Sequence, residues 1–222
     1  MKFTVSRKKT FGGLLVLLNL FLAVYATPVH YLDDTPHYLL LAKSFSGQDI
    51  GMNLSHRSPL YSMLLAGFML LFKPPLLYKL IVLLQYALLA VCSWMLYGLF
   101  RRILAEKRTA MLAALLFNCS LGAIYFANIL LPEILGVFLL ILSLRLLVQF
   151  YDTGKWAPAL FLGLVIGLLN LARFNTVPLG ATFGILVLLV LARHKGTIPE
   201  RAKAFGLFAV SYLLVLNAWC LY

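Results

Sequence analysis

Long apolar runs separated by short basic clusters dominate this sequence and limit what it can fold into. Apolar residues make up 63% of the 222 residues and charged residues only 12%, and the mean hydropathy is +0.95. A bilayer contains no water to satisfy backbone N–H and C=O groups, so apolar runs of this kind must form helices that satisfy these groups internally. The sequence therefore predicts an all-α integral membrane protein, with residues 1–222 as a single transmembrane domain.

Seven of the runs are long enough to cross a membrane, because a bilayer core of roughly 30 Å needs about 20 apolar residues and tolerates somewhat fewer. An eighth run, 59–72, is shorter, since it begins at Pro59 and stops before Lys73. Its length is typical of an interfacial or re-entrant helix. We therefore expect about seven transmembrane helices, at 11–32, 76–100, 109–126, 133–150, 157–172, 176–192 and 204–222.

Counts of lysine and arginine in the loops indicate that the run 59–72 does not cross. Without that crossing, thirteen of these residues lie inside and five outside; with it, seven lie inside and eleven outside. Basic residues are enriched in cytoplasmic loops, so we expect a cytoplasmic N-terminus and an outer loop over 33–75 that carries amphipathic or interfacial helices. The expected location is a cytoplasmic (inner) membrane, with the endoplasmic reticulum as an alternative. Cleavage of the first apolar run as a signal peptide also stays open.

The formal net charge of +12 does not indicate a nucleic-acid-binding protein. Such proteins gather basic residues on a water-facing surface, whereas here the basic residues lie at the ends of apolar runs. We interpret them as cytoplasmic anchors and expect no nucleic-acid partner. The cysteines lie within apolar runs, without His or Cys neighbours at metal-ligand spacing, so we expect core residues rather than a metal site at Cys92, Cys119 and Cys220.

Two acidic positions expected outside the membrane begin helices. Asp33 and Asp34 come directly before a threonine and a proline, a pattern that predicts a short helix over 35–45. Glu133 follows a proline at the start of an apolar run. A carboxylate is stabilised at the positive end of a helix dipole, so helix capping alone would explain both positions. The other interpretation is that these carboxylates are catalytic.

Several cationic or titratable residues accompany these carboxylates. Arg57 stands beside a proline turn, and its planar guanidinium offers paired donors for phosphate oxygens, although anchoring to lipid headgroups would explain it too. His56 and His37 lie in the same outer loop and are candidate hydrogen-bond donors or metal ligands. Arg173 lies between two apolar runs, where a charge usually has a partner or a task unless it simply ends a helix.

Three short patterns in this sequence resemble the GT-C glycosyltransferases, polytopic enzymes that use lipid-linked sugars. Asp34, Tyr38 and Ala42 resemble the Asp-x-x-x-Tyr-x-x-x-Ala pattern of the first outer loop in that family. Residues 57–61, Arg-Ser-Pro-Leu-Tyr, resemble an Arg-Pro-Pro-Leu-Tyr turn that starts a juxtamembrane helix, with one proline replaced. Residues 131–133, Leu-Pro-Glu, resemble the second acidic position.

The resemblance implies inverting transfer of a sugar from a polyprenyl-phosphate carrier to an acceptor on the outer face, with a loop carboxylate as base. It gives Asp34 the role of first-loop carboxylate, with Asp33 as its neighbour and fallback, and it gives Glu133 the second acidic role. The acceptor stays open among a glycolipid, a polysaccharide and a protein, and a divalent metal is not excluded. The candidate substrate-binding residues are Arg57, His56, Tyr38, His37, Lys79 and Arg173.

Full-length members of the resembled family usually continue beyond a seven-helix core, so we expect this chain to represent the N-terminal core only. It would then be a fragment, a minimal relative or a module that needs a partner chain. A non-enzymatic transporter or flippase subunit, or an inactive fragment, is the main alternative, although we find no internal repeat of the kind that transporters show. A second alternative is an acyl or phosphoryl transferase. Such enzymes are expected to place a histidine close to an acid, and His37 lies near Asp34 in the sequence.

Overall fold

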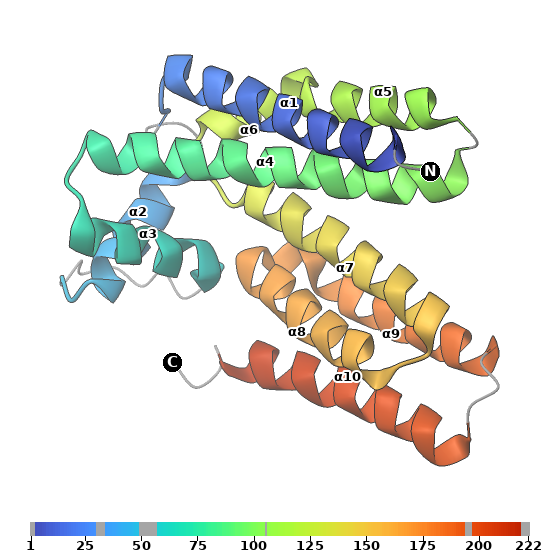
Figure 1. The fold of residues 1–222 in the computed structure, drawn as a ribbon. Helices are drawn as coiled ribbons and strands as arrows, with labels where there is room; N and C mark the ends of the chain where they lie inside the picture. The colour runs from blue at the N-terminus through green and yellow to red at the C-terminus, as the bar shows by residue number, and fades with distance from the viewer. Residues whose placement is uncertain (1–2, 30–33, 49–56, 105, 194–196, 219–222) are drawn as a thin grey trace. The chain divides into compact units, whose positions relative to one another are not determined.

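The computed structural model describes residues 3–29, 34–48, 57–104, 106–193 and 197–218, with the backbone alone for residues 3–9. Almost all of these residues are helical (Figure 1), which confirms the all-α prediction. The elements are α1 (Phe3–Tyr25), α2 (Thr35–Phe45), α3 (Pro59–Leu71), α4 (Leu76–Ile103), α5 (Lys107–Asn118), α6 (Leu121–Asn128), α7 (Glu133–Thr153), α8 (Trp156–Ala172), the 3-10 helix η1 (Phe174–Thr176), α9 (Val177–Arg193) and α10 (Ile198–Ala218).

Four helical stretches among the described residues are long and apolar enough to cross a membrane, namely α4, α7, η1 together with α9, and α10. The pair α5 and α6 would make a fifth crossing, bent by 42°. Many large apolar side chains are exposed, among them Leu17 (66%), Leu189 (56%) and Leu214 (67%), as lipid-facing side chains would be. The chain is therefore a multi-pass membrane protein. The count of seven crossings stays a prediction, because α1 and α8 fall among the shorter apolar helices.

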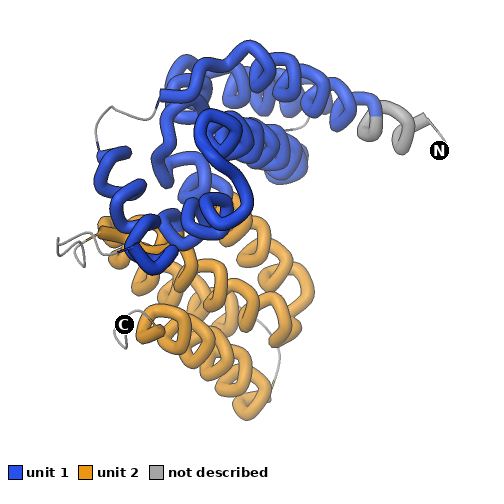
Figure 2. Tube along the Cα trace, turned by 90° about the vertical axis from the view of Figure 1, so that its left-hand side faces the viewer, with its two compact units in different colours: residues 1–54, 61–138 blue, residues 55–60, 139–222 orange. Residues whose placement is uncertain are grey.

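The chain divides into two compact units, which Figure 2 distinguishes by colour. Unit 1 comprises 1–54 and 61–138, and unit 2 comprises 55–60 and 139–222. In unit 1, α1 and α5 pack against α4. Its core also includes side chains of α2, α3 and the segment 127–134, which leads from α6 into α7. This core brings the starts of α2 and α7, where the acidic candidates lie, into one unit.

The run expected as one crossing at 109–126 is broken into α5 and α6. Asn118, the last residue of α5, is fully buried and pairs with Asn19 of α1, with amide nitrogen-to-oxygen distances of 3.1 and 3.4 Å. Ser120 then caps α6 by accepting a hydrogen bond from the backbone N–H of Ala123 at 3.3 Å. A helix start inside an apolar run is explained by this cap and by the buried asparagine pair.

Unit 2 is held together by close packing of α8 on α10. Gly163 and Gly167 of α8 face α10 at a spacing that lets two helix backbones approach closely. A Cβ atom added to Gly167 would lie 2.7 Å from the Cβ of Val215, and one added to Gly163 would overlap the Ser211 hydroxyl. Ser211 also donates a hydrogen bond to the backbone oxygen of Leu160 at 2.9 Å.

The two short helices α2 and α3 have the predicted bounds, and the bounds of two longer helices differ. Helix α2 covers the predicted 35–45, and α3 occupies the predicted short run. Helix α10 begins at Ile198 instead of 204, because Thr197 donates hydrogen bonds from its N–H and hydroxyl to Glu200 at 2.9 and 3.0 Å. The Glu200 carboxylate thus satisfies the N–H that precedes α10, which is one of the two bonds of a capping box, and the helix begins ahead of its apolar run. Helix α1 ends at Tyr25, seven residues before the predicted end.

Candidate functional site

Asp34 occupies the N-cap position of α2, but its side chain does not cap the helix. The backbone oxygen of Asp34 accepts hydrogen bonds from the N–H groups of His37 and Tyr38 at 3.0 and 3.3 Å. Its side chain makes no capping hydrogen bond, and its backbone is in the right-handed helical region instead of the extended conformation usual for an N-cap. Asp34 therefore makes no capping hydrogen bond with its side chain, and its carboxylate lies at the positive end of the α2 dipole.

The carboxylate of Asp34 lies beside the imidazole of His37, one helical turn along α2. The Nδ1 of His37 is 3.7 Å from Oδ1 of Asp34, and the two side chains are 41% and 50% exposed. This distance exceeds that of a hydrogen bond. The i, i+3 spacing at a helix start accounts for the proximity, so the pair is a weak electrostatic contact in which Asp34 stays open to solvent.

Glu133 begins α7 in the same unit, and a short β-bridge joins the chain leading to it with the chain leading toward Asp34. The bridge is parallel and pairs Val29 with Ile129. The N–H of Val29 donates to the oxygen of Asn128 at 2.9 Å, and the N–H of Leu130 donates to the oxygen of Val29 at 3.2 Å. Glu133 itself is half-buried. The bridge therefore fixes the segment from which Glu133 projects.

Gln85, a buried residue of α4, holds this segment from the other side. Its Nε2 donates to the backbone oxygens of Ala127 at 3.1 Å and Ile129 at 2.8 Å. Its Oε1 accepts a hydrogen bond from the hydroxyl of Tyr61 in α3 at 3.4 Å. A single amide thus joins α4 to α3 and to the chain that enters α7. It donates to the oxygen of Ala127, and it adds a second donor to the oxygen of Ile129, which also accepts from the N–H of Leu131 at 2.9 Å.

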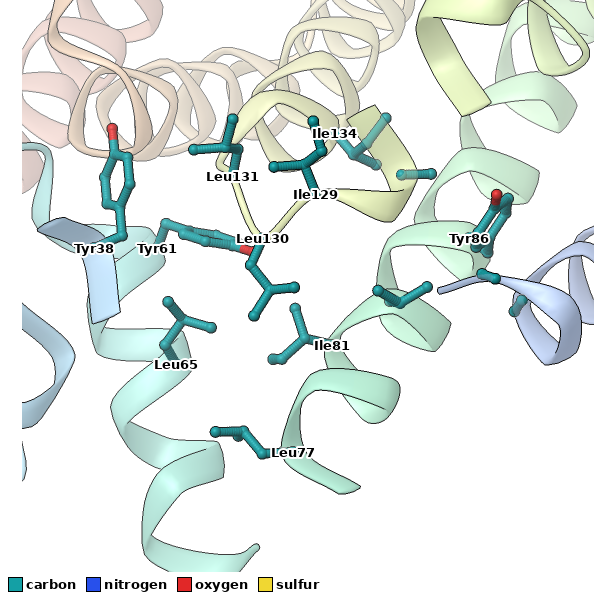
Figure 3. Close-up of a cluster of buried hydrophobic side chains, with 14 of the residues drawn as sticks. Tyr38, Tyr61, Leu65, Leu77, Ile81, Tyr86, Ile129, Leu130, Leu131 and Ile134 are labelled. Carbon is teal, nitrogen blue, oxygen red and sulfur yellow. The ribbon is translucent and has the colours of Figure 1, made fainter. Parts of the chain in front are cut away.

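Tyr61 connects the two acidic positions through the core of unit 1. Its ring meets the ring of Tyr38 of α2 edge-on, with centroids 5.8 Å apart, as Figure 3 shows. Burial raises the pKa of the Tyr61 phenol well above its usual range, and the nearby charge of Glu133 raises the pKa further. The Tyr61 hydroxyl therefore stays protonated, as its hydrogen bond to Gln85 requires, in the electrostatic neighbourhood of Glu133.

Lys79, expected among the substrate-binding residues, contacts the end of α1. Its ammonium donates to the backbone oxygen of Val24 at 3.0 Å and to that of Ala26. Cations near a helix C-terminus satisfy its last carbonyl groups and interact favourably with the helix dipole. In this structure Lys79 caps the C-terminal end of α1.

The two arginine candidates, Arg57 and Arg173, belong to unit 2, and a tertiary hydrogen bond brings their neighbours together. The hydroxyl of Ser58 accepts from the backbone N–H of Phe174 at 3.0 Å. Both arginines are half-buried. The turn at Arg173 is fixed locally, because the hydroxyl of Thr176 donates to the Arg173 backbone oxygen at 2.6 Å. Unit 2 therefore places two cations from distant parts of the sequence at one end of α8.

Two of the predicted site residues, Asp33 and His56, lie outside the described residues. Across the part of the chain that the structure describes, no three His, Cys, Asp or Glu side chains converge as a metal site requires. Sequence reasoning assigned no role to Gln85 or Tyr61, which the structure places at the centre of the unit 1 network. A lone glutamine within a long apolar run was the available signal, since polar residues inside spans usually contact other helices.

Comparison with known families gives one match. The family of dolichyl-phosphate-mannose-protein mannosyltransferases matches residues 56–220. The matched range includes Arg57, Gln85, Glu133 and Arg173, and it begins after Asp34. Neither the curated proteins nor the solved structures yield a match to this chain.

Proposed function

Because the chain belongs to the family of dolichyl-phosphate-mannose-protein mannosyltransferases, we propose that it moves a sugar from a polyprenyl-phosphate carrier to an acceptor at the outer face of the membrane. One observation carries this proposal beyond the family match. Within unit 1, Tyr38 and Tyr61 connect the helix that begins after Asp34 with the electrostatic surroundings of Glu133. Two carboxylates at helix starts in one unit supply the acid–base groups that sugar transfer needs.

Asp34 is the proposed general base. The acceptor hydroxyl attacks the anomeric carbon of the donor sugar, and its proton passes to the Asp34 carboxylate. The bond between the anomeric carbon and the phosphate oxygen breaks at the same time, and polyprenyl phosphate leaves with the electron pair. Attack from the face opposite the phosphate inverts the anomeric centre. A positioned base of this kind contributes typically 10²–10⁴-fold to the rate.

The surroundings of the two carboxylates favour this division of roles. Asp34 is half-exposed, with a side chain that caps no helix, so its oxygens are accessible to an acceptor. Glu133 is half-buried on a segment held by Gln85 and by the β-bridge, so its position is fixed by the fold. A fixed second carboxylate suits the orientation of a sugar or acceptor hydroxyl.

Arg57 and Arg173 are the proposed phosphate ligands. The leaving phosphate gains negative charge in the transition state, and a guanidinium stabilises that charge most strongly where water is partly excluded. Both side chains are half-buried, which fits this requirement. The donor is thus a polyprenyl-phosphate-linked sugar, and the acceptor is a glycolipid, polysaccharide or protein. A partner chain could supply acceptor recognition. We also propose a cytoplasmic-membrane location with the N-terminus inside.

The test is transfer of radiolabelled sugar from polyprenyl phosphate in membranes that contain the protein at matched levels. Asp34→Asn should lower transfer about 10²–10⁴-fold, because the amide cannot accept the proton, and Glu133→Gln should also lower it. Asp152→Asn is the matched control, since Asp152 is an exposed carboxylate near the end of α7. Full activity in both site variants would contradict the proposed base, and inactivity of the unmodified protein alongside its native neighbours would favour a non-enzymatic role.

A further inference from the structure

A hollow of about 520 Å³ lies in unit 2, and none of the residues assigned above to sugar transfer lines it. It is formed where the turn 153–156 between α7 and α8 meets the end of α9 and the start of α10. The lining side chains include Leu191, Glu200, Arg201 and Lys203. All of these segments lie at the ends of helices where basic residues gather, which is the end expected inside by loop charge.

The lining carries an excess of positive charge. Lys155, Arg201 and Lys203 contribute three cations, and Glu200 contributes one carboxylate. The Glu200 carboxylate accepts hydrogen bonds from both the N–H and the hydroxyl of Thr197, so it is engaged in capping α10. The three cations exceed the one carboxylate by two charges, and this net positive charge favours an anion in the hollow.

The start of α8 contributes Lys155 and Trp156 to the lining of the same hollow. Gly154 adopts a φ of +62°, which allows the chain to turn sharply between α7 and α8. Lys155 occupies the N-cap position of α8 and provides no side-chain cap. The first N–H groups of a helix have no partner within the helix, and they lie at the positive end of its dipole. The positive end of the α8 dipole and the three cations of the lining together favour phosphate oxygens.

Aromatic and apolar groups at the rim indicate that this anion belongs to a lipid. Trp156 is 48% exposed, and the ammonium of Lys203 lies 5.3 Å from the centre of its ring. Tryptophan with lysine or arginine is typical of the boundary between a bilayer and water. Leu191 lines the hollow and belongs to α9, one of the helices apolar enough to cross the membrane. The hollow is thus lined both by charged side chains and by Trp156 and Leu191, which are residue types found at the membrane interface and in the bilayer.

We propose that this hollow binds the phosphate headgroup of an anionic phospholipid in the leaflet at the basic end of unit 2. The lipid phosphate contacts Lys155, Arg201 and Lys203, and the lipid tails extend along the apolar surface beside Leu191. Basic pockets between membrane helices on the cytoplasmic side bind such headgroups. The bound lipid links the α7–α8 turn to the start of α10 and stabilises this end of the unit. The inference is independent of the proposed sugar transfer.

The test uses the full chain in phosphatidylcholine nanodiscs in which phosphatidylglycerol progressively replaces the neutral lipid. We expect the unfolding temperature to rise with phosphatidylglycerol content, and native mass spectrometry to detect retained phosphatidylglycerol. Lys155→Gln with Lys203→Gln should weaken the apparent affinity on the order of tenfold, and both side chains are exposed, so folding should survive. Arg201→Gln should weaken it too.

The matched control removes two charges from another basic helix start, with Lys107→Gln and Arg108→Gln in α5. These substitutions should leave the phosphatidylglycerol effect as in the unmodified protein. An equal loss in both double variants would overturn the proposal, because general surface charge would then explain the effect. Equal stabilisation by inorganic phosphate in pure phosphatidylcholine would overturn the assignment to a lipid and indicate a soluble anion. Absence of any phosphatidylglycerol effect would also overturn it.

Discussion

At the residue scale, Asp34 and Glu133 have different surroundings. The difference fits proton transfer by Asp34 and substrate orientation by Glu133. Asp34 is half-exposed beside an exposed histidine. Glu133 is half-buried, and its charge raises the pKa of the buried Tyr61 phenol. A solvent-accessible carboxylate can exchange a proton with an incoming acceptor, whereas a carboxylate fixed beside buried hydroxyls suits orientation of a substrate. The side chains around them give two predictions at this scale.

His37 distinguishes sugar transfer from acyl or phosphoryl transfer. Those reactions would use the imidazole beside Asp34 as a base or nucleophile, so His37→Gln would abolish them. In the sugar-transfer account His37 only modulates Asp34 across 3.7 Å, and we expect His37→Gln to retain transfer within about tenfold of the unmodified rate, which corresponds to a weak exposed contact. The measurement is initial rate at matched expression. Complete loss with intact folding would favour the alternative chemistry.

Substitution of Gln85 should lower both thermal stability and sugar transfer, although Gln85 carries no charge. Gln85→Leu removes the donor for two buried backbone oxygens and the acceptor for Tyr61. The oxygen of Ile129 keeps the N–H of Leu131 as a donor. Loss of the hydrogen bonds to Ala127 and Tyr61 leaves buried groups unsatisfied, which costs about 1–3 kcal/mol, and the segment that carries Glu133 loses its support. We expect lower thermal stability and lower transfer. The control is Ser93→Ala, because Ser93 is a buried residue of α4 whose hydroxyl donates only to Leu89 of the same helix. Equal effects in the two variants would contradict a positioning role for Gln85.

At the scale of the elements, the packing of helices against one another sets the arrangement within each unit. In unit 1, buried asparagines join α1 to α5 and mark the break before α6. In unit 2, small residues of α8 allow α10 to approach closely. Interhelical hydrogen bonds in membranes average about 0.6 kcal/mol, so close glycine packing should contribute more than any single polar pair. A substitution at the α8–α10 contact should therefore change stability more than a substitution at a polar pair.

Gly163→Ala should destabilise unit 2 strongly, because the added methyl group would overlap the Ser211 hydroxyl and the Phe208 backbone oxygen. Overpacking of this kind costs about 1–3 kcal/mol. Gly206→Ala provides the control, since Gly206 of α10 has no atom within 4 Å of the added Cβ position. Thermal unfolding in detergent compares the two. A similar unfolding temperature for both variants would show that the α8–α10 packing differs from that described here.

The sequence predicted the bounds of α2 and α3 well because their start signals are local. The proline after Asp34 and Pro59 mark the beginnings of α2 and α3. The break at Asn118 and the role of Gln85 were not predictable from local signals, because both depend on partners far along the chain, Asn19 and Tyr61. The function of Lys79 as a cap of α1 depends on a tertiary contact in the same way. By contrast, the spacing of Gly163 and Gly167 could have predicted a packing face.

The number and direction of membrane crossings belong to the scale of the whole molecule. Among the described residues, four helices qualify as crossings by length and composition, and the bent pair would add a fifth. The shorter helices α1, α3 and α8 decide the final topology. If α3 does not cross, the loop charges favour a cytoplasmic N-terminus, and Asp34 and Glu133 lie on the same outer side. The location of α3 is therefore decisive for the proposed chemistry.

Labelling of single cysteines with a membrane-impermeant maleimide tests this topology. Cysteine at Gln48 or Lys73, exposed positions on either side of α3, should react in intact cells, and cysteine at Thr153 should react only after permeabilisation. This pattern follows if α3 stays on the outer side. Labelling of position 48 from outside and of position 73 only after permeabilisation would show that α3 crosses. The background needs replacement of Cys92, Cys119 and Cys220.

The most direct measurement of the central claim is a comparison of sugar donors in membranes that contain the protein with its native neighbours. We expect radiolabelled sugar to reach an acceptor from polyprenyl phosphate but not from a nucleotide sugar when carrier synthesis is blocked, and the transfer should be lost in Asp34→Asn. Polyprenyl phosphate should be released in step with the transfer. Equal use of the nucleotide sugar, or polyprenyl-phosphate-dependent transfer that persists unchanged in Asp34→Asn and Glu133→Gln, would contradict the account.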